Sequence, residues 1–393
     1  MRDLTQQRDG WVRLVDFAWV AFAVVLVGKG VFAPGQHTVY GHYATAAGRW
    51  WAGTDIYQPD RYLYSPTFAV CMTPFALLPV RLGMTLFTAV NVFALYKCLQ
   101  MLARRVLGPE WSERRTALFV YLAGIASMHG LWVHQINSLA FVLCAYAGVA
   151  AHKQRGWTAA WLLAAAVWIK LWPMPFALLL VASAPRLLAA RLAVCLTALA
   201  AAPFLTAAPG YVLAQYEGWF EQLTDWGGMY RARTRDALAV LPFTVSHTVQ
   251  LGVQLVTGAL VLAWCLRVQR LFGRGLRLLT AQLAIWPAWQ LLFGPAVARD
   301  TFGLVAPMTS WAVVMSFERG RGRTLALAAW ITITTLGEGV AERALTALWP
   351  GAVGVLPLGV ALYVVWLLRF PFAKPEREPD PGVAGSGSTK PGV

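Results

Sequence analysis

An apolar run occupies residues 11–33 and reads WVRLVDFAWVAFAVVLVGKGVFA. A helix of about 20 apolar residues spans the hydrocarbon core of a bilayer, so this run is long enough to cross. Arg2, Arg8 and Arg13 lie at or before its start, but the run exceeds the apolar region of a secretory signal peptide and carries no clear cleavage site. We therefore expect an uncleaved first transmembrane helix.

The composition extends this interpretation to the whole chain. Of the 393 residues, 58% are hydrophobic and 13% are charged, and the mean hydropathy is +0.54. Soluble domains carry about 25% charged residues, and so much apolar side chain excludes disorder for the bulk of the chain. The 19 tryptophans suit membrane interfaces. The sequence predicts an all-α polytopic membrane protein.

Further apolar runs follow at 84–103, 116–130, 136–151, 157–170, 173–184, 189–206, 246–266, 276–297, 301–317, 324–338 and 348–368. Together with residues 11–33 they predict a bundle of about 12 transmembrane helices. We treat residues 1–370 as a single transmembrane domain. Residues 371–393 are rich in Pro, Gly and Ser and are expected to form a disordered cytoplasmic tail.

The basic residues indicate the orientation. Residues 64–80 are apolar but contain Pro66, Pro74 and Pro79, which break helices. If this segment does not cross and the N-terminus is cytoplasmic, 22 Lys and Arg residues fall inside and 8 outside, whereas a crossing reverses the bias. We expect both termini in the cytoplasm, a plasma (inner) membrane location, and an interfacial or re-entrant segment at 64–80 on the outer side. Cytoplasmic loops then explain the net charge of +15, so no nucleic-acid partner is expected.

The first outer loop of this topology covers residues 34–83. It opens with HTVYGHYATAAGRWWAG, which predicts a helix lying on the membrane interface. Tyr40, Tyr43, Trp50 and Trp51 are the side chains that suit that depth.

The second outer loop covers residues 207–245 and is again rich in aromatic side chains. It predicts a second interfacial helix. Asp225, Gly227 and Gly228 predict a turn or hinge within it.

Lys170 is the most unusual polar residue because it lies within AAAVWIKLWPMPF. An ammonium group in apolar surroundings is costly and needs a partner. Pro173 and Pro175 follow it, so the helix breaks there and the lysine can line a cavity. The phosphate of a lipid-linked substrate suits it as a partner, and the alternative is a lysine that extends to the membrane interface.

Two more polar clusters interrupt apolar sequence on the outer side. MHGLWVHQINSLAF contains His134, Gln135 and Asn137, which either form a binding site or cap helix ends and bond between helices. FGPAVARDTFGLVAP contains Arg299 and Asp300, for which a local ion pair is the simpler explanation. No H-E-x-x-H, Walker or G-x-S-x-G motif is visible, and the five cysteines have no C-x-x-C spacing. We expect no metal and no cofactor.

Five stretches stand in an informative order: YATAAGRWWAGTDIY at 43–57, YLYSPTFAVCMTPFALLPVRLGMTLF at 62–87, HQIN at 134–137, WIKLWP at 168–173 and LFGPAVARDTFGLVAP at 292–307. Together they resemble glycosyltransferase family 87, which contains the polyprenyl-phosphate-mannose-dependent mannosyltransferases of the GT-C fold. The resemblance covers most of residues 37–310 and implies a GT-C-like helical bundle.

The resemblance also implies an activity. An inverting hexosyltransferase of this kind would move a hexose, mannose in the first instance, from a polyprenyl-phosphate donor to a glycan or glycolipid acceptor on the extracytoplasmic side. Lys170, together with Arg231, Arg233 or Arg299, would stabilise the charge on the leaving phosphate. The other expected substrate-binding residues are Tyr57, Tyr64, Ser65, His134, Gln135, Asn137 and Asp300. The alternatives are a transporter or flippase for a lipid-linked or polar substrate, and an inactive homologue of the family.

The catalytic base is where the sequence departs from the family. Members usually carry an Asp near the start of the first outer loop, and that position is Val39 here, flanked by His37 and His42. Asp55 is our first candidate for the base and His42 the second, since either can accept a proton from an acceptor hydroxyl. Asp55 can equally cap the turn that follows it.

The topology predicts which positions meet the outer medium. In a variant without native cysteines, Asp225→Cys should react with a membrane-impermeant thiol reagent in intact cells, and Glu110→Cys should react only after the membrane is permeabilised. The parent without cysteines is the control. Labelling of position 110 from outside would reverse the assignment.

Overall fold

A computed structural model describes residues 10–58, 62–229, 237, 245–294, 297–336, 344, 347–348 and 355–372. All regular elements within these residues are helices, which confirms the all-α class. The longer ones are α1 (Gly10–Phe32), α2 (Tyr40–Trp51), α3 (Pro66–Cys71), α4 (Thr73–Ala76), α5 (Val80–Leu102), α6 (Glu113–Trp132), α7 (Asn137–His152), α8 (Gly156–Ile169), α9 (Met174–Ser183), α10 (Pro185–Ala201), α11 (Pro209–Met229), α12 (His247–Phe272), α13 (Leu276–Phe293), α14 (Ala306–Arg319), α15 (Arg323–Ile331) and α17 (Val355–Arg369). Short 3₁₀ or π segments are η1 (Ala103–Leu107), η2 (Ala202–Leu205), η4 (Arg299–Leu304) and η5 (Thr332–Leu336).

Each predicted apolar run overlaps a helix in the described residues, although the ends differ by several residues and parts of the runs 276–297, 324–338 and 348–368 lie outside those residues. Within the described residues, four helices are long and apolar enough to cross a membrane by length and composition: α1, α5 with η1, α10 with η2, and α12. Apolar helices α7, α8, α9 and α17 are shorter. The number of crossings therefore stays a prediction.

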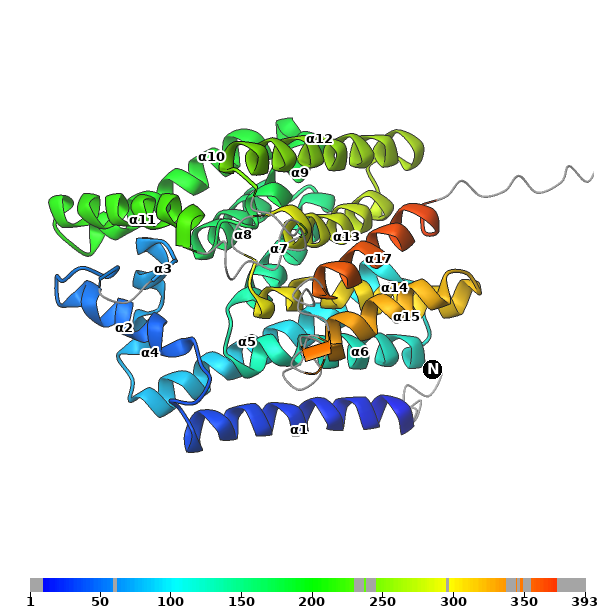
Figure 1. Ribbon diagram of the computed structural model, residues 1–393, viewed down its shortest axis with the longest axis horizontal. Coiled ribbons are helices and arrows are strands. Elements are labelled where there is room, and N and C mark those ends of the chain that lie inside the picture. Colours follow the sequence, from blue (N-terminus) through cyan, green and yellow to red (C-terminus); the bar gives the residue numbers. More distant parts are fainter. Residues whose placement is uncertain are drawn as a thin grey trace, which may run out of the picture.

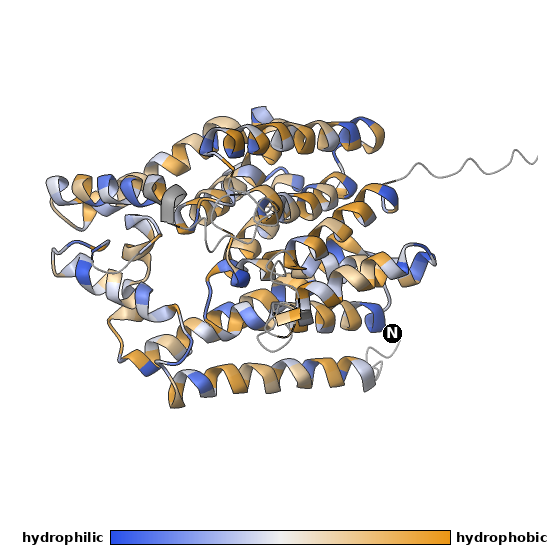
Figure 2. Ribbon diagram, viewed as in Figure 1, coloured by the Kyte–Doolittle hydropathy of each residue, from blue (hydrophilic) through white to orange (hydrophobic). Residues whose placement is uncertain are grey.

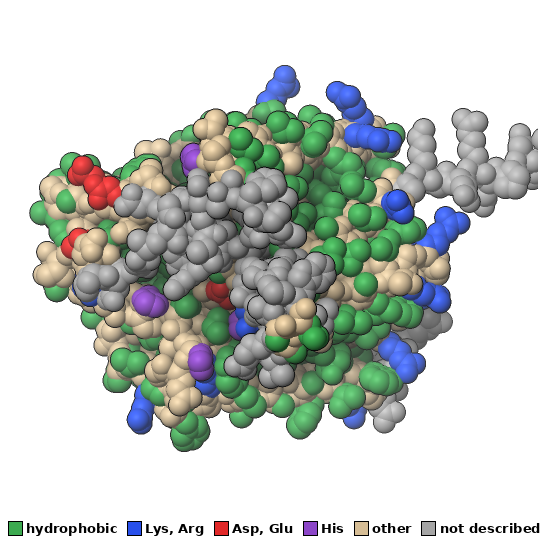
Figure 3. Space-filling view, viewed as in Figure 1, with side chains coloured by type: hydrophobic (Ala, Val, Ile, Leu, Met, Phe, Trp, Pro, Cys, Tyr) green, Lys and Arg blue, Asp and Glu red, His purple; other side chains and the backbone are tan. Residues whose placement is uncertain are grey.

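The two ends of the molecule differ in character. Figure 1 places α2, α3, α4 and α11 at one end, and the start of α1 and the end of α17 at the other. On the face shown in Figure 3, most Lys and Arg side chains project near the end that holds the start of α1 and the end of α17, whereas the Asp, Glu and His side chains lie toward the end with α2 and α11. This is the asymmetry that the charge count predicts for the two sides of a membrane.

The outermost helices expose apolar side chains along their length. Phe17 and Val24 on α1, and Leu255 and Leu260 on α12, are each more than 60% exposed. In Figure 2 hydrophobic residues fill these two helices, which lie along opposite edges of the bundle. So large an apolar surface is unfavourable in water and favourable against lipid, so the chain is an integral membrane protein.

The core of the bundle is built around α13. Trp286 is fully buried there, stacked on Phe141 of α7 at 6.2 Å and 5.1 Å from Phe176 of α9, measured between ring centroids. Its indole N–H donates to the carbonyl oxygen of Trp172 at 2.9 Å. Close packing and interhelical hydrogen bonds of this kind hold helices together in a membrane. The same contact holds the chain just after Lys170 against the core.

A second buried cluster forms between the outer loops and corrects one expectation. Residues 40–51 are helical as predicted, but Tyr40, Tyr43 and Trp50 are nearly fully buried in protein, and only Trp51 is exposed. The aromatic side chains pack against one another and against α3 and α11, because burying several rings together removes more apolar area from water than leaving each at an interface.

The proline-containing segment 64–80 forms the two short helices α3 and α4. They hold 6 and 4 residues, far below the roughly 20 needed to span a bilayer. In the second loop, the predicted turn at Asp225, Gly227 and Gly228 is wrong, because α11 continues to Met229. Each of the two glycines destabilises a helix by only about 1 kcal/mol relative to alanine, and the rest of a long continuous helix can offset this cost.

Gly83 allows the closest approach in this region. A Cβ atom there would overlap the carbonyl oxygen of Phe75 and the hydroxyl of Tyr40. Gly83→Ala should therefore lower stability by about 1–3 kcal/mol and reduce the melting temperature of the detergent-solubilised protein. Gly41→Ala is the matched control, since nothing lies within 4 Å of a Cβ at that position. Equal melting temperatures for the two variants would contradict the packing.

Candidate functional site

Lys170 lies where α8 ends, in extended backbone. Its ammonium donates a hydrogen bond to Oδ1 of Asn137 at 3.1 Å. It also stands 4.1 Å from the ring centre of Trp172 and 5.3 Å from that of Tyr64. Aromatic faces attract a cation, so these two rings replace part of the lost hydration.

The hairpin of α7 and α8 brings Lys170 and Asn137 together. Asn137 is the first residue of α7 and Lys170 follows the last residue of α8, so antiparallel packing places them at one end. The amide Nδ2 of Asn137 donates to the backbone oxygen of Asp300 at 3.1 Å, which attaches η4 to this point. Within the described part of the chain, Lys170 forms no contact ion pair and donates one hydrogen bond, and the Asp300 carboxylate acts on it through its charge. Two of its three N–H groups are free for an anion.

Two tyrosines from the first outer loop close one side of this site. The hydroxyls of Tyr43 and Tyr64 lie 3.0 Å apart, and each lies 3.3 Å from Oε1 of Gln135. Burial, then the neighbouring Tyr64, and to a smaller extent the charge of Asp300, raise the pKa of Tyr43 well above its ordinary value. The Tyr43 hydroxyl therefore remains protonated, and the Asp300 carboxylate lies close enough for its charge to act on it.

Tyr57 and Ser65 hold backbone in place. The Tyr57 hydroxyl donates to the carbonyl oxygen of Tyr64 at 3.1 Å. The Ser65 hydroxyl donates to the carbonyl oxygen of Trp168 and accepts from the N–H of Phe68, which caps α3. These contacts support the position of Tyr64 beside Lys170.

His134 is buried and unusual. It has a positive φ of 59°, is 3% exposed, and neither ring nitrogen has a hydrogen-bond partner among the described residues. Burial, and then the charge of Lys29, lower the pKa of His134 to about 4. It is therefore neutral at neutral pH. Lys29 itself donates to the backbone oxygens of Trp132 and His37, so that lysine is structural.

The position that departs from the family lies beside this histidine. The N–H of Val39 donates to the carbonyl oxygen of Val133 at 3.0 Å, directly before His134. His42, in the first turn of α2, is exposed. Asp55 is also exposed, and its Oδ1 accepts from the N–H of Tyr57 at 2.8 Å, the turn-capping contact considered above.

The two candidate bases, His42 and Asp55, lie far apart along α2. His42 lies in the first turn of α2 and Asp55 lies beyond its last residue, Trp51; the rise along the helix from His42 to Trp51 is roughly 14 Å. Arg299 lines a small cavity of about 20 Å³ together with His129 and Thr334.

Arg231 and Arg233 lie outside the described residues. Within the described residues, no group of three or more His, Cys, Asp or Glu side chains is placed to hold a metal ion. Sequence reasoning missed Trp172 as a neighbour of Lys170, and Tyr43 as a partner of Tyr64 and Gln135. Trp172 lies two residues away in the same motif, and that spacing could have suggested it.

Fold and site define a helical integral membrane protein in which the partly buried cation of Lys170 lies between residues 34–83 and the bundle. Comparison with known protein families matches residues 62–286 to glycosyltransferase family 87. The match covers more than half of the chain, and the chain belongs to this family. It is a membrane glycosyltransferase. No curated protein matches the sequence. The matched range contains Lys170, Tyr64 and the 134–137 segment, whereas Val39 and Asp55 lie before it.

Proposed function

We propose that the protein transfers a hexose, mannose in the first instance, from a polyprenyl-phosphate donor to a glycan or glycolipid acceptor on the extracytoplasmic side of the plasma membrane. The observation that carries this proposal is the Lys170 ammonium, which has two free N–H groups and no contact ion pair among the described residues, although the Asp300 charge acts on it. A phosphate group would supply a negative charge in direct contact with it.

The chemistry requires a cation at the leaving group. In a direct displacement, the acceptor oxygen bonds to the anomeric carbon while the bond from that carbon to the phosphate oxygen breaks, so the configuration inverts. The bonding pair stays on the phosphate, whose negative charge grows. Lys170 stands in a low-dielectric site where a fixed ammonium stabilises such charge more than in water. Asn137, Trp172 and Tyr64 hold it in place before substrate arrives.

The acceptor hydroxyl also needs a group that takes its proton. Asp300 is supported by its position, because its backbone is bonded to Asn137 and its carboxylate acts on Tyr43. Asp55 and His42 remain candidates, with exposed side chains at opposite ends of α2. The Val39 substitution favours one alternative, an inactive member of the family, and the following experiments distinguish it.

Lys170→Ala should reduce transfer from a polyprenyl-phosphate sugar by at least about 10²-fold, because the leaving phosphate loses its cation. Lys170→Arg should retain part of the activity, since charge is kept while shape changes. Turnover is measured with purified full-length protein and a radiolabelled donor. The matched control is Lys97→Ala, a lysine in apolar α5 that lies against the rings of Phe93 and Tyr96.

Unchanged turnover in Lys170→Ala would remove the phosphate role. An inactive wild-type protein that still binds the donor, with binding weakened by Lys170→Ala, would identify a family member without transferase activity. Movement of donor across vesicle bilayers without sugar transfer would instead indicate a flippase.

The base is identified by comparing three variants. Asp300→Asn keeps shape and hydrogen-bonding reach but removes basicity, so we expect kcat to fall by about 10²–10⁴-fold with donor binding intact. Asp55→Asn should change kcat little, because an amide oxygen can still accept from the N–H of Tyr57. Full activity in Asp300→Asn, with loss in Asp55→Asn or His42→Ala, would assign the base to the first outer loop.

A further inference from the structure

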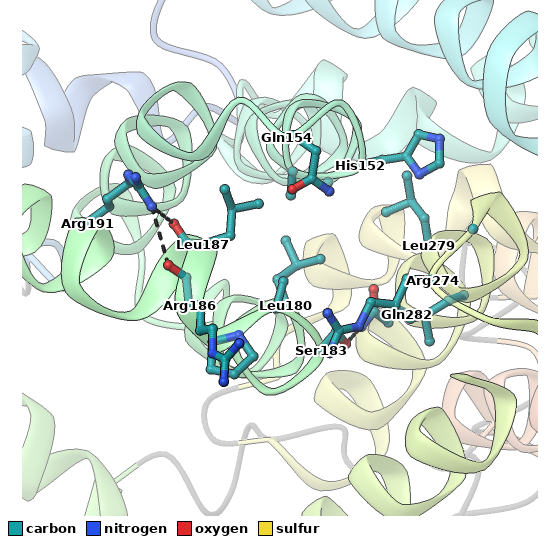
Figure 4. Close-up of a pocket in the computed structure, with 16 residues that line it drawn as sticks. His152, Gln154, Leu180, Ser183, Arg186, Leu187, Arg191, Arg274, Leu279 and Gln282 are labelled. Carbon is teal, nitrogen blue, oxygen red and sulfur yellow. Dashed lines mark hydrogen bonds between the residues drawn. The ribbon is translucent and has the colours of Figure 1, made fainter. Parts of the chain in front are cut away.

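A cavity of about 740 Å³ opens at the end of the α7–α8 hairpin opposite Lys170. The 16 residues of α7 extend roughly 24 Å, from Asn137 beside Lys170 to His152 at the cavity. Figure 4 shows the cavity between the ends of α7 and α9 and the beginnings of α10 and α13. It is therefore separate from the transferase site.

The rim of the cavity is basic. His152, Arg186, Arg191 and Arg274 come from α7, α10 and the link between α12 and α13, and none of the described residues that line it is Asp or Glu. Arg186 and Arg274 are exposed. Their guanidinium groups have no hydrogen-bond, ion-pair or ring partner in the described part of the chain. Two permanent charges at one opening, without a counterion, favour an anionic ligand.

The position of Arg191 is well defined. Its Nη1 donates to the carbonyl oxygens of Leu187 at 2.6 Å and Arg186 at 3.4 Å, which Figure 4 marks with dashed lines. Its guanidinium also lies 5.7 Å from the ring centre of Trp157. This arginine adds a half-buried positive charge whose geometry is set before a ligand binds.

The interior of the cavity is mainly apolar. Leu180, Leu187 and Leu279 point into it in Figure 4. Gly148 lines it too, and a Cβ atom there would overlap the side chain of Leu279, so the glycine lets α7 approach α13 closely. The buried polar pair, Ser183 and Gln282, is bonded internally, with Nε2 to Oγ at 2.6 Å. A basic rim over an apolar interior suits an amphiphile.

We propose that this cavity binds the phosphate headgroup of an anionic lipid, with Arg186 and Arg274 at the phosphate and an acyl chain along Leu180 and Leu279. Arginine pairs with phosphate through two parallel hydrogen bonds. The cavity lies at the end that the charge distribution assigns to the cytoplasm, where anionic lipids occur and basic pockets between helices bind their headgroups. The apolar interior favours a lipid over free phosphate.

Binding is tested on the full-length protein in a non-ionic detergent. The probes are phosphatidylglycerol and phosphatidylcholine that carry the same fluorescent acyl chain. We expect wild-type protein to prefer phosphatidylglycerol, and Arg186→Gln with Arg274→Gln to weaken its binding by about tenfold or more. Arg267→Gln with Arg270→Gln is the matched control, because these exposed α12 residues change the net charge equally and do not line the cavity.

The outcomes separate the sources of phosphate. If the site binds lipid, phosphatidylglycerol stays bound when sodium phosphate is added at the same concentration as the lipid. Displacement of the lipid under that condition would overturn the lipid assignment. Equal weakening by both double variants would reduce the effect to net charge and overturn the site. Equal binding of phosphatidylglycerol and phosphatidylcholine by wild-type protein would also overturn the site. Melting temperatures near the wild-type value confirm that the variants are folded.

Discussion

The partners of one ammonium group organise the half of this protein that contains α2, α3 and the start of α7. The chain around Lys170 leaves its side chain only partly exposed, and a cation that loses water is stable only where protein groups replace that water. Asn137 accepts a hydrogen bond while Trp172 and Tyr64 present their rings. Because Asn137 also bonds the backbone of Asp300, the end of α8, the start of α7, the first outer loop and η4 meet at one point.

Positively charged side chains lie at both ends of the α7–α8 hairpin, but their surroundings differ. At one end a single cation lies among rings with few competing charges, which suits stabilisation of charge that appears during a reaction. At the other end several exposed guanidinium groups surround an apolar cavity, which suits retention of a ligand that is already charged. The core contacts of Trp286 with Phe141 and Phe176 pack α7 and α9 against α13, so both ends belong to one packed core.

Val39 lies next to His134, because its N–H donates to the carbonyl oxygen of Val133. This histidine is neutral because burial and the Lys29 charge disfavour its protonated form. An uncharged ring with two unpartnered nitrogens can give or accept a hydrogen bond, but it supplies no negative charge. The negative charge near the Lys170 site comes instead from the Asp300 carboxylate, which acts on Tyr43.

The sequence by itself determined the helical membrane class, the extent of most helices, the break after Lys170 and the family. These features depend on apolar run length, proline position and local motif order, which are properties of short segments. Only the tertiary structure decided that Tyr40, Tyr43 and Trp50 are buried in protein, and that α11 continues through its two glycines. It alone joined Lys170 to Asn137, 33 residues apart, and separated His42 from Asp55 along α2. Such relations depend on which helix faces pack together, and the spacing of residues within one segment carries no information about its neighbours in space.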